Sequence, residues 1–514
     1  MENEENKTKR IAKNTLMLYF RMMFLMVISL YTSRVVLNTL GVEDFGVYNV
    51  IGGFVALFAI LSKSMSSAIS RFFNYTMGQK NAARLAMVFS ASVTIEIGLA
   101  IVIAILCEIV GIWFITEKMV LAPDRIPAAL WVLHFSIATF CMTLISVPYN
   151  AAIIAHERMR AFAYISVYEG LVKLGISFLI MISPIDRLVF YSGLICCLQI
   201  SVRYLYQRYC RKNFEECKFS IHFEKKLFRE IASFAIWNFI GSASGILRNH
   251  GGNVLVNLFF GPVANAARGV ANQVLHAIEG FANNFMTAVK PQIQKSFASG
   301  DRTYMMFLIF KSARLSYYMI LLLSLPVLIK TDFVLNLWLV NPPSHAVSFV
   351  RLTLIFSMIE AFSHPLETAQ QATGKVKKYQ MIVGGIQLLN IPVSYLLYKM
   401  GGPAETFLIV AIGCGLCCLT ARLIYLHYSV KLDSLLFLRK VIFNVTLVSL
   451  MSASVPSIVA FYLPNTFASF AIVTIISLAL TALVIYFIGC DSEERHFIVN
   501  HARKFKAKFS KKEK

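Results

Sequence analysis

The sequence predicts an all-α polytopic membrane protein with about 14 transmembrane helices, arranged as two parallel six-helix repeats plus two C-terminal helices. The prediction rests on composition, on the spacing of apolar segments and on the placement of Lys and Arg. Of the 514 residues, 57% are hydrophobic and only 15% are charged, which is typical of chains that have the bilayer as solvent. Apolar runs of about 20 residues, the length that spans a bilayer as a helix, follow one another almost without pause.

The apolar runs define the expected helices. They lie at residues 14–37, 46–70, 85–110, 128–153, 161–182, 188–207, 230–256, 264–289, 304–329, 346–370, 379–398, 404–428, 441–461 and 466–489. The first run is too long for a cleavable signal peptide, lacks a small-residue cleavage site and is followed directly by a second helix. We therefore expect it to remain in the protein.

Basic residues alternate between the links that join these helices. The net charge is +22, and most Lys and Arg of the links fall on one side. The opposite side carries five, namely Lys118, Arg125, Arg187, Lys330 and Lys399. This asymmetry follows the positive-inside rule and predicts that both termini are cytoplasmic. The charge is therefore mainly a topology signal with a weaker role against anionic lipid, and it does not indicate a nucleic-acid partner.

The helix order also gives expected domain boundaries. These are an N-lobe with helices one to six (1–210), a basic cytoplasmic linker (211–229), a C-lobe with helices seven to twelve (230–430), the last two helices (431–489) and a basic cytoplasmic tail (490–514). The cysteines inside the spans, including Cys196, Cys197 and the run at 414–418, have no His or carboxylate at metal spacing. We expect no metal site and buried packing for them.

Two motifs recur at nearly the same offset. The segment ending at Gly41 resembles the one ending at Gly261, and "PYNAAIIAHERMR" from Pro148 resembles "PLETAQQATGKVK" from Pro365. The pattern predicts a tandem duplication of six helices, and an even number leaves the copies parallel. Parallel repeats are a transporter architecture in which two bundles rock about a site between them. In "LGVEDFG" we expect a tight outer turn, with Gly41 and Gly46 permitting the reversal.

Ten basic residues lie in or near the expected spans. Five are close to helix ends, where long side chains can reach water: Arg21, Lys311, Arg314, Arg351 and Arg422. Arg34, Lys63, Lys173, Arg248 and Arg268 lie deeper, where lipid exposure would cost about 2.5–3.5 kcal/mol each. We expect these five to face protein or a wet cavity.

Helical phase groups the polar residues into stripes. They are Asn265, Arg268, Asn272, His276, Glu279 and Asn283 on helix eight; Asn238, Gly241, Gly245, Arg248 and Gly252 on helix seven; Glu360, His364, Glu367 and Gln371 on helix ten; and Ser166, Glu169, Lys173 and Ser177 on helix five. The helix-seven stripe fits either a cavity wall or a close helix–helix seam. On helix five, Glu169 and Lys173 can simply neutralise each other.

The candidate binding residues for an anionic headgroup are predominantly basic. They are Arg34, Lys63, Arg248, Arg268, Asn272 and Lys173. Guanidinium groups bind phosphate oxygens in a bidentate manner, and an ammonium serves as a mobile point charge. An undecaprenyl pyrophosphate headgroup carrying a sugar chain suits such a cavity, although another organic anion would satisfy the same charge.

Three segments carry a resemblance to a known family. They are "KNTLMLYFRMMFLMVISLYTSRVVLNTLGVEDFGVYNVIGG", "SSAISRFFNY" and "GPVANAARGVANQV". The sequence resembles Wzx-type O-antigen and polysaccharide repeat-unit flippases of the multidrug/oligosaccharidyl-lipid/polysaccharide (MOP) exporter superfamily. The resemblance implies two six-helix lobes in a V shape and alternating access. It also implies movement of a polyprenyl-pyrophosphate-linked oligosaccharide to the outer leaflet of the bacterial inner membrane, within lipopolysaccharide biosynthesis. Arg34, Lys63, Arg248 and Arg268 fit the basic cavity residues of such flippases, and related lipid II flippases also have two extra C-terminal helices.

The source of energy is expected to be an ion gradient. The chain lacks a Walker loop, and we expect no cofactor. His276, Glu279, Glu360, His364 and Glu367 are candidates for H⁺ or Na⁺ coupling, or they compensate nearby Arg charge. Expected partners are the lipid-linked oligosaccharide, membrane lipids and polysaccharide polymerase or assembly proteins.

Three other functions would require different features of the sequence. A cation-coupled multidrug exporter of the same superfamily would prefer a cavity with carboxylates and aromatics. A polymerase or ligase would need a larger outer loop and a catalytic motif, neither of which is seen, so we expect no enzyme. A purely structural anchor leaves the polar stripe of helix eight without a purpose.

Overall fold

The computed structural model describes residues 2–56, 58–117, 119, 121–218, 224–339, 342–491 and 494–495. All regular secondary structure in these ranges is helical. Twelve helices there are long and apolar enough to cross a membrane. The other two expected helices, in segments 42–78 and 262–298, fall outside this set and occupy corresponding places in the two repeats. The predicted all-α membrane fold is confirmed. Of the predicted basic tail, residues 496–514 lie outside the described residues.

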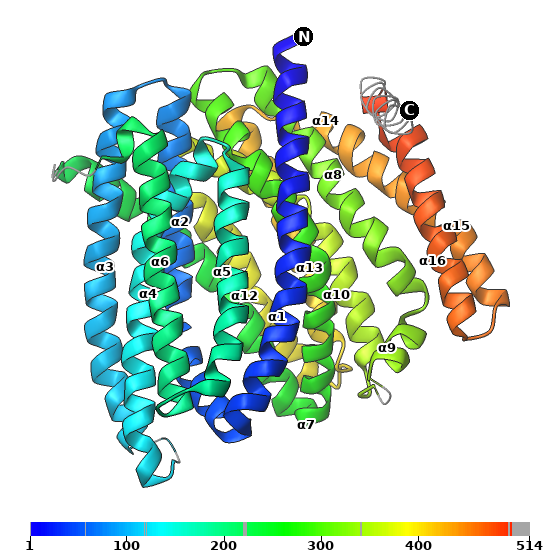
Figure 1. Ribbon diagram of the computed structural model, residues 1–514. Coiled ribbons are helices and arrows are strands. Elements are labelled where there is room, and N and C mark those ends of the chain that lie inside the picture. Colours follow the sequence, from blue (N-terminus) through cyan, green and yellow to red (C-terminus); the bar gives the residue numbers. More distant parts are fainter. Residues whose placement is uncertain are drawn as a thin grey trace, which may run out of the picture. The chain divides into compact units, whose positions relative to one another are not determined.

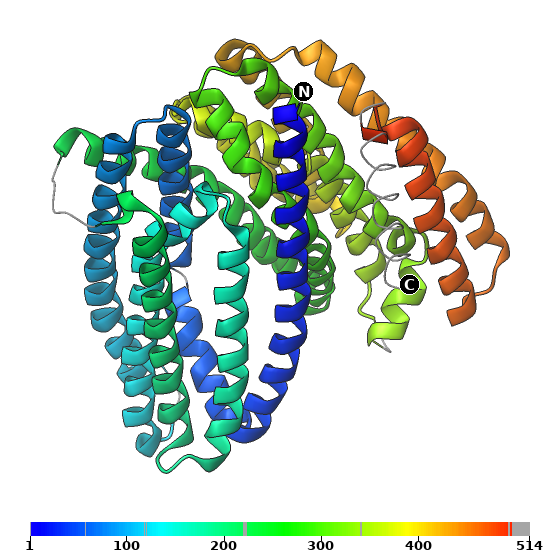
Figure 2. The same ribbon diagram turned by 45° about the horizontal axis from the view of Figure 1, so that its top comes forward.

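The first of two compact units comprises residues 1–243, 287–305 and 371–381. Its helices are α1 (Glu2–Ala56), α2 (Ala59–Gly78), α3 (Ala82–Glu117), α4 (Ile126–Ala155), α5 (Met159–Leu179), α6 (Arg187–Asn213) and both ends of α7 (Lys225–Ala298). Helix α4 packs against α3 and α6, and α1 packs against α5, as Figures 1 and 2 show. Buried aromatic residues such as Phe73, Phe89 and Tyr149 fill the core between them.

The second compact unit comprises residues 244–286, 306–370 and 382–514. It contains the middle of α7 and the following helices: α8 (Arg302–Ile329), α9 (Thr331–Leu339), α10 (Ala346–Glu360), α11 (Ser363–Thr373), α12 (Lys377–Lys399), α13 (Thr406–Val430), α14 (Ser434–Phe437), α15 (Asn444–Tyr462) and α16 (Phe467–Val484). The break between α10 and α11 lies just before Pro365, whose missing N–H and ring disfavour a continuous helix. The two units do not coincide with the expected lobes, whose boundaries remain a prediction.

Backbone conformation supports the internal repeat. Gly41 (φ 81°, ψ 170°) and Gly261 (φ 76°, ψ −173°) share an unusual conformation and lie 220 positions apart. Lys80 and Gly300, also 220 apart, both have positive φ. So do Glu157 and Gly374, which are 217 apart, the same offset as the two Pro motifs. Irregular geometry at three matching places is expected of duplicated helical bundles.

The turn expected at "LGVEDFG" is confined to a single residue. Only Gly41 has positive φ there, whereas Gly46 lies in regular helix that continues to Ala56. The expectation that Gly46 helps to reverse the chain was therefore wrong. Gly41 alone provides the bend because its backbone is in a region that side-chain-bearing residues avoid.

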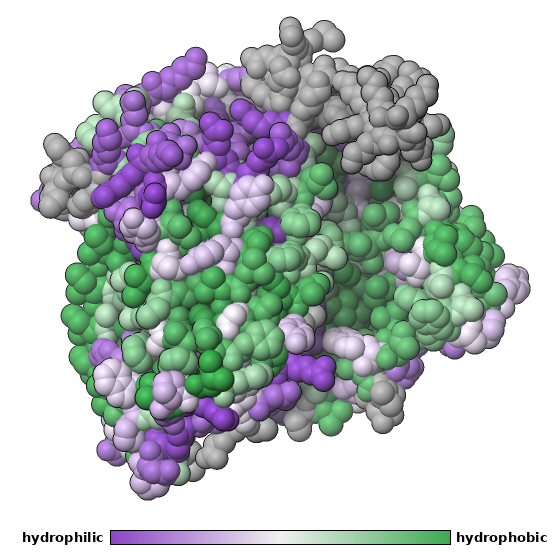
Figure 3. Space-filling view, in the orientation of Figure 1, coloured by the Kyte–Doolittle hydropathy of each residue, from purple (hydrophilic) through white to green (hydrophobic). Residues whose placement is uncertain are grey.

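Large apolar side chains cover the outer faces of the helices. Helix α3 exposes Ile101, Val102, Ile105 and Ile109, and Figure 3 shows hydrophobic residues along the helices and hydrophilic ones gathered toward their ends. An apolar exposed surface of this kind fits a protein surrounded by lipid, since soluble proteins rarely leave such large contiguous patches.

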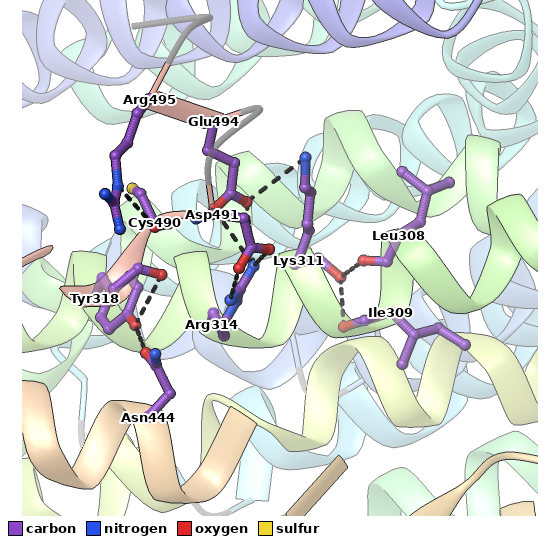
Figure 4. Close-up of polar contacts among 12 residues, drawn as sticks. Leu308, Ile309, Lys311, Arg314, Tyr318, Asn444, Cys490, Asp491, Glu494 and Arg495 are labelled. Atoms are coloured by element: carbon purple, nitrogen blue, oxygen red, sulfur yellow. Dashed lines mark hydrogen bonds and ion pairs between the residues drawn. The ribbon is translucent and has the colours of Figure 1, made fainter. Parts of the chain in front are cut away.

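The C-terminal helices α15 and α16 are attached to α8 by polar contacts. Near one end, Arg314 donates hydrogen bonds to both carboxylate oxygens of Asp491 at 2.7 and 3.3 Å, and Glu494 lies 3.3 Å away. Figure 4 shows this cluster together with Lys311 and Tyr318. Near the other end, buried Lys330 donates to Asn465 at 3.0 Å and to the backbone carbonyls of Ala460, in the last turn of α15, and Leu463, just after it. These pairs explain how charged residues are accommodated beside an apolar hairpin.

Two arginines of the second unit behave differently from the sequence-based expectation. Arg314 and Arg422 were expected near helix ends with their side chains extending to water, but they are only 6% and 3% exposed, and Arg314 lies well inside α8. Arg314 pairs with Asp491, and Arg422 donates to Ser363 at 2.5 Å. Internal partners replace water because the nearby helices supply acceptors within the protein.

We predict that Gly41→Ala and Gly261→Ala each destabilise the protein by about 1–3 kcal/mol, because this backbone region is strained for any residue with a Cβ. An added Cβ would meet no atom within 4 Å at either site, so the cost is purely conformational. Thermal unfolding of the purified protein in detergent measures the effect. Gly46→Ala and Gly269→Ala, in regular helix with equally open surroundings, are the controls. Equal destabilisation by the controls would contradict the assignment.

We predict that Asp491 stabilises the fold in a pH-dependent way. The hydrogen bonds from Arg314 hold the pKa of the Asp491 carboxyl below its ordinary value. Its contribution is therefore complete above the unfolded value of about 3.9 and is lost as pH falls through the lower native value.

The measurement is the melting temperature of wild type and Asp491→Asn between about pH 7 and 3. The difference should be constant down to about pH 5 and should narrow below about pH 4. Substitution of the exposed Asp124 serves as the control. A gap that widens on acidification would rule out this role.

Candidate functional site

Arg268 is the most deeply enclosed of the predicted binding residues. Its side chain comes from the second half of α7 and is only 4% exposed. It donates to the backbone carbonyl and the side-chain oxygen of Asn249 at 3.1 and 3.0 Å, and it lies 4.3 Å from the ring centre of Phe407. Nε and Nη1 are buried and have no hydrogen-bond partner among the described residues. The guanidinium therefore lacks two of the hydrogen bonds that a buried cation ordinarily makes.

Arg248 lies in the same neighbourhood. It is half-buried, it stands 4.8 Å from the ring centre of Phe356, and it directly precedes Asn249, the residue to which Arg268 donates. Two like charges held near each other in a low-dielectric region are costly unless an anion or water compensates them. The second unit therefore brings together two of the predicted basic residues.

The small residues of α7 make close contacts with neighbouring helices. An added Cβ at Gly241 would lie 2.0 Å from the side-chain oxygen of Gln380, and one at Gly252 would lie 2.3 Å from Arg268 Nη1. Asn238 accepts a hydrogen bond from Gln380 at 3.1 Å. The seam interpretation of this face is thus supported, and Gly252 leaves the space that Arg268 occupies.

The other four predicted binding residues are divided between the two units. Arg34, Lys63 and Lys173 are exposed on the first unit, and Asn272 is half-buried on the second. Arg21, which was expected to extend to water, instead donates to Ser166 at 3.1 Å, on the stripe that also carries Glu169 and Lys173. A single cavity shared by all six binding residues remains a prediction.

The candidate coupling residues all belong to the second unit. His276 is exposed, whereas Glu279, Glu360, His364 and Glu367 are half-buried. Glu360 Oε1 lies 3.8 Å from Arg422 Nη1, as expected if this carboxylate compensates an Arg charge. A role in ion coupling remains a prediction for the whole group.

Corresponding residues of the two repeats meet inside the first unit. Asn74 of α2 donates to Gln294 near the end of α7 at 2.8 Å, and both side chains are almost completely buried. A Cβ added to Gly78 would lie 2.6 Å from the Cβ of Ala298. Both pairs are 220 positions apart, so this contact is self-complementary in the way that a twofold axis requires.

A buried carboxylate connects three segments at this end of the first unit. Glu157, in the turn after α4, is 6% exposed. Its carboxylate lies 2.6 Å from Arg10 Nε and 2.9 Å from Lys295 Nζ, and it accepts a hydrogen bond from Gln292 at 2.5 Å. Its backbone carbonyl accepts from Asn14 at 3.3 Å. One carboxylate thus joins α1, the α4–α5 turn and the end of α7.

Sequence reasoning missed two acidic residues. Glu157 lies in the repeated Pro motif, where it corresponds to Gly374, and this mismatch was the available signal. Glu96 on α3 is fully buried, and neither carboxylate oxygen has a hydrogen-bond partner among the described residues. It is a single acid in an apolar run, and no periodic stripe marked it.

We predict that Glu157→Gln lowers the free energy of unfolding by about 1–3 kcal/mol, because the amide removes the negative charge that faces Arg10 and Lys295 and replaces one acceptor oxygen with a donor. Chemical denaturation of the purified protein measures this. Glu230→Gln is the matched control, because Glu230 is 41% exposed and lies 3.8 Å from Arg84, and exposed pairs contribute about 0–1 kcal/mol. Equal stability of Glu157→Gln and wild type would refute the role of Glu157.

Comparisons with known proteins agree with this architecture. The family model described as "Polysaccharide biosynthesis protein" matches residues 11–297, more than half of the chain. The MatE family model matches residues 251–396. No curated protein matches the sequence.

Several solved structures share the fold. A multidrug resistance MATE family transporter of the MOP superfamily in an outward-facing conformation has a TM-score of 0.72 at 10% identity, covering 83% of this chain and 96% of its own. A MOP superfamily transporter from Pyrococcus furiosus, described by the reverse polarity of its binding pocket, has a TM-score of 0.64 at 11% identity, with 82% and 97% covered. The MATE transporter ClbM in complex with Rb⁺ has a TM-score of 0.63 at 14% identity, with 80% and 93% covered.

At these identities the structural matches show the fold alone, while the family model covers the larger part of the sequence. Together they confirm the resemblance to Wzx-type flippases of the MOP superfamily and indicate a transporter, not an enzyme. The chain belongs to the polysaccharide biosynthesis protein family, a group of multi-pass membrane transporters.

Proposed function

We propose that this protein is a lipid-linked oligosaccharide flippase. By alternating access it moves an undecaprenyl-pyrophosphate-linked polysaccharide repeat unit, such as an O-antigen unit of lipopolysaccharide, from the cytoplasmic to the outer leaflet of the bacterial inner membrane. Both termini are cytoplasmic in this proposal. The product is passed to polysaccharide polymerase or assembly proteins.

The observation that carries the proposal is the environment of Arg268. Its guanidinium is buried and retains two donors without partners among the described residues, and Arg248 adds a second positive charge nearby. Guanidinium donors match phosphate oxygens in geometry and charge. An anionic pyrophosphate would relieve the repulsion between the two arginines as it crosses the low-dielectric interior.

Ion coupling is part of the proposal. The candidates from sequence are His276, Glu279, Glu360, His364 and Glu367, and Glu96 joins them because it is a buried carboxyl without a hydrogen-bond partner among the described residues. An isolated buried carboxyl is tolerated only when it carries a proton or meets a cation. Protonation from an H⁺ gradient, or occupation by Na⁺, would change the charge inside the protein during each cycle.

The alternative is a cation-coupled multidrug exporter of the same superfamily. The match of the MatE model to residues 251–396 and the fold shared with MATE transporters favour it. Exporters of cationic drugs require acidic and aromatic binding surfaces. The paired arginines therefore weigh against this alternative.

The flippase proposal predicts loss of transport when the guanidinium donors are removed. In a strain that lacks the protein, lipid-linked repeat units should accumulate, and wild type should clear them. Arg268→Gln and Arg248→Gln should clear them roughly 10–100-fold less efficiently, the range expected for a lost hydrogen bond to a charged group. The measurement is the amount of undecaprenyl-linked glycan extracted at matched expression.

Arg351→Gln is the control, because this arginine pairs with the exposed Asp332 at 3.0 Å and should behave as wild type. Unchanged lipid-linked glycans together with increased sensitivity to cationic dyes would replace the flippase proposal with the drug-exporter alternative.

A further inference from the structure

A second basic site lies within the first unit and is made of residues other than the predicted binding residues. It is a cavity of about 860 Å³ lined by the end of α2, the first turns of α7 and the link between α11 and α12. Pockets of about 300–1,000 Å³ are typical for small-molecule ligands. α11 ends here and α7 and α12 begin here. Since these three helices belong to candidate membrane spans, we expect the cavity at the level where they reach the membrane surface.

The lining is strongly cationic with an aromatic wall. Among the described lining residues, the basic ones are Arg71, Lys225, Lys226, Arg229, Lys375 and Lys377, and the single acid is Glu230, which lies 3.8 Å from Arg84. Lys377 Nζ lies 4.8 Å from the ring centre of Trp237. Such an excess of positive charge favours an anion, and Trp is common at the level of lipid headgroups.

Arg71 is the buried basic residue of this cavity, and its position is fixed by several neighbours. It is 9% exposed, and its guanidinium is enclosed by the rings of Phe72 and Phe234 at 4.6 and 5.4 Å. Nη2 makes a long 3.4 Å hydrogen bond to the carbonyl of Ala372, and Nε has no partner among the described residues. Gly374 is required for this placement, since a Cβ there would lie 2.4 Å from Nη2.

Helix ends add to the positive potential. Helices α7 and α12 both begin at lysines that line the cavity, Lys225 and Lys377. The residue before α7, Glu224, makes no side-chain capping bond to the first turn. Free amide groups and the positive end of the helix dipole favour phosphate at such places.

We propose that this cavity binds the phosphate group of a lipid headgroup at the membrane surface. Two lipids share that chemistry: an anionic phospholipid of the bilayer, and the prenyl diphosphate that carries the oligosaccharide. The second source rests on the proposed flippase function, whereas the first does not. In either case the basic residues hold phosphate, the aromatic wall contacts the attached group, and the lipid chain stays in the bilayer.

The test is a binding measurement on the full-length protein in phosphatidylcholine nanodiscs. Native mass spectrometry measures the affinities for cardiolipin and for undecaprenyl diphosphate, and inorganic pyrophosphate tests whether the headgroup alone suffices. Lys225→Gln/Lys226→Gln removes two exposed charges from the cavity, and Lys377→Gln removes one from a different helix. Arg211→Gln/Lys212→Gln is the matched control, because it removes two exposed charges from the last turn of α6.

We expect affinity to fall about fivefold for each cavity lysine removed, as for basic residues near an anionic surface, and to be unchanged in the control. Loss confined to cardiolipin identifies a phospholipid site, and loss confined to undecaprenyl diphosphate identifies a substrate site. Equal affinities of the cavity variants and the control for both lipids would overturn the proposal. Because binding is measured without transport, this result is independent of whether the protein flips an oligosaccharide.

Discussion

The backbone conformation of Gly261, which Gly41 repeats in the first copy, is the constraint on which the candidate site depends. A helix longer than the bilayer must bend sharply if its second half is to return, and without a break α7 would continue straight for 74 residues. The bend at Gly261 folds the second half back so that Arg268 reaches Asn249, nineteen positions earlier. Gly252 then leaves room for the guanidinium. The arginine site therefore depends on two glycines with different roles. Gly261 bends the chain, and Gly252 leaves room for the guanidinium.

The contact between Asn74 and Gln294 shows how the duplication is used structurally. Residues at equivalent places in two copies can meet only close to the axis that relates the copies. Asn74 and Gln294 form one such pair, and Gly78 and Ala298 form another. Side-chain amides are well suited to such a place, since each carries both a donor and an acceptor. Because both are almost completely buried, they stabilise the register in which they face each other, and a shift would break their hydrogen bond.

The sequence predicts those features that depend on averages over many residues. Hydropathy and charge alternation were sufficient for the helices, and two motifs at nearly the same offset were sufficient for the repeat. Helical phase selected Arg268, which contacts Asn249, the neighbour of Arg248. Single-residue geometry was not predictable. Gly41 and Gly46 are equally permissive, and only tertiary packing selects the first. Arg314 was expected near a helix end and in contact with water, because nothing local reveals that Asp491 approaches it from 177 positions away. Glu96 is one acid in an apolar run, and its burial depends on which face α3 packs inward.

Glu157 shows how a departure from symmetry points to function. The equivalent residue, Gly374, has positive φ at no steric cost, whereas Glu157 adopts φ 57° with a side chain attached. Such strain persists only where other interactions compensate it, and here the carboxylate is held by Arg10, Lys295 and Gln292. In the equivalent turn of the second copy, Gly374 has no side chain, and the space is occupied by the guanidinium of Arg71. One turn of the duplicated fold thus supplies a negative charge that binds the end of α7. The other makes space for a positive charge from α2, so two equivalent turns have acquired complementary electrostatic roles.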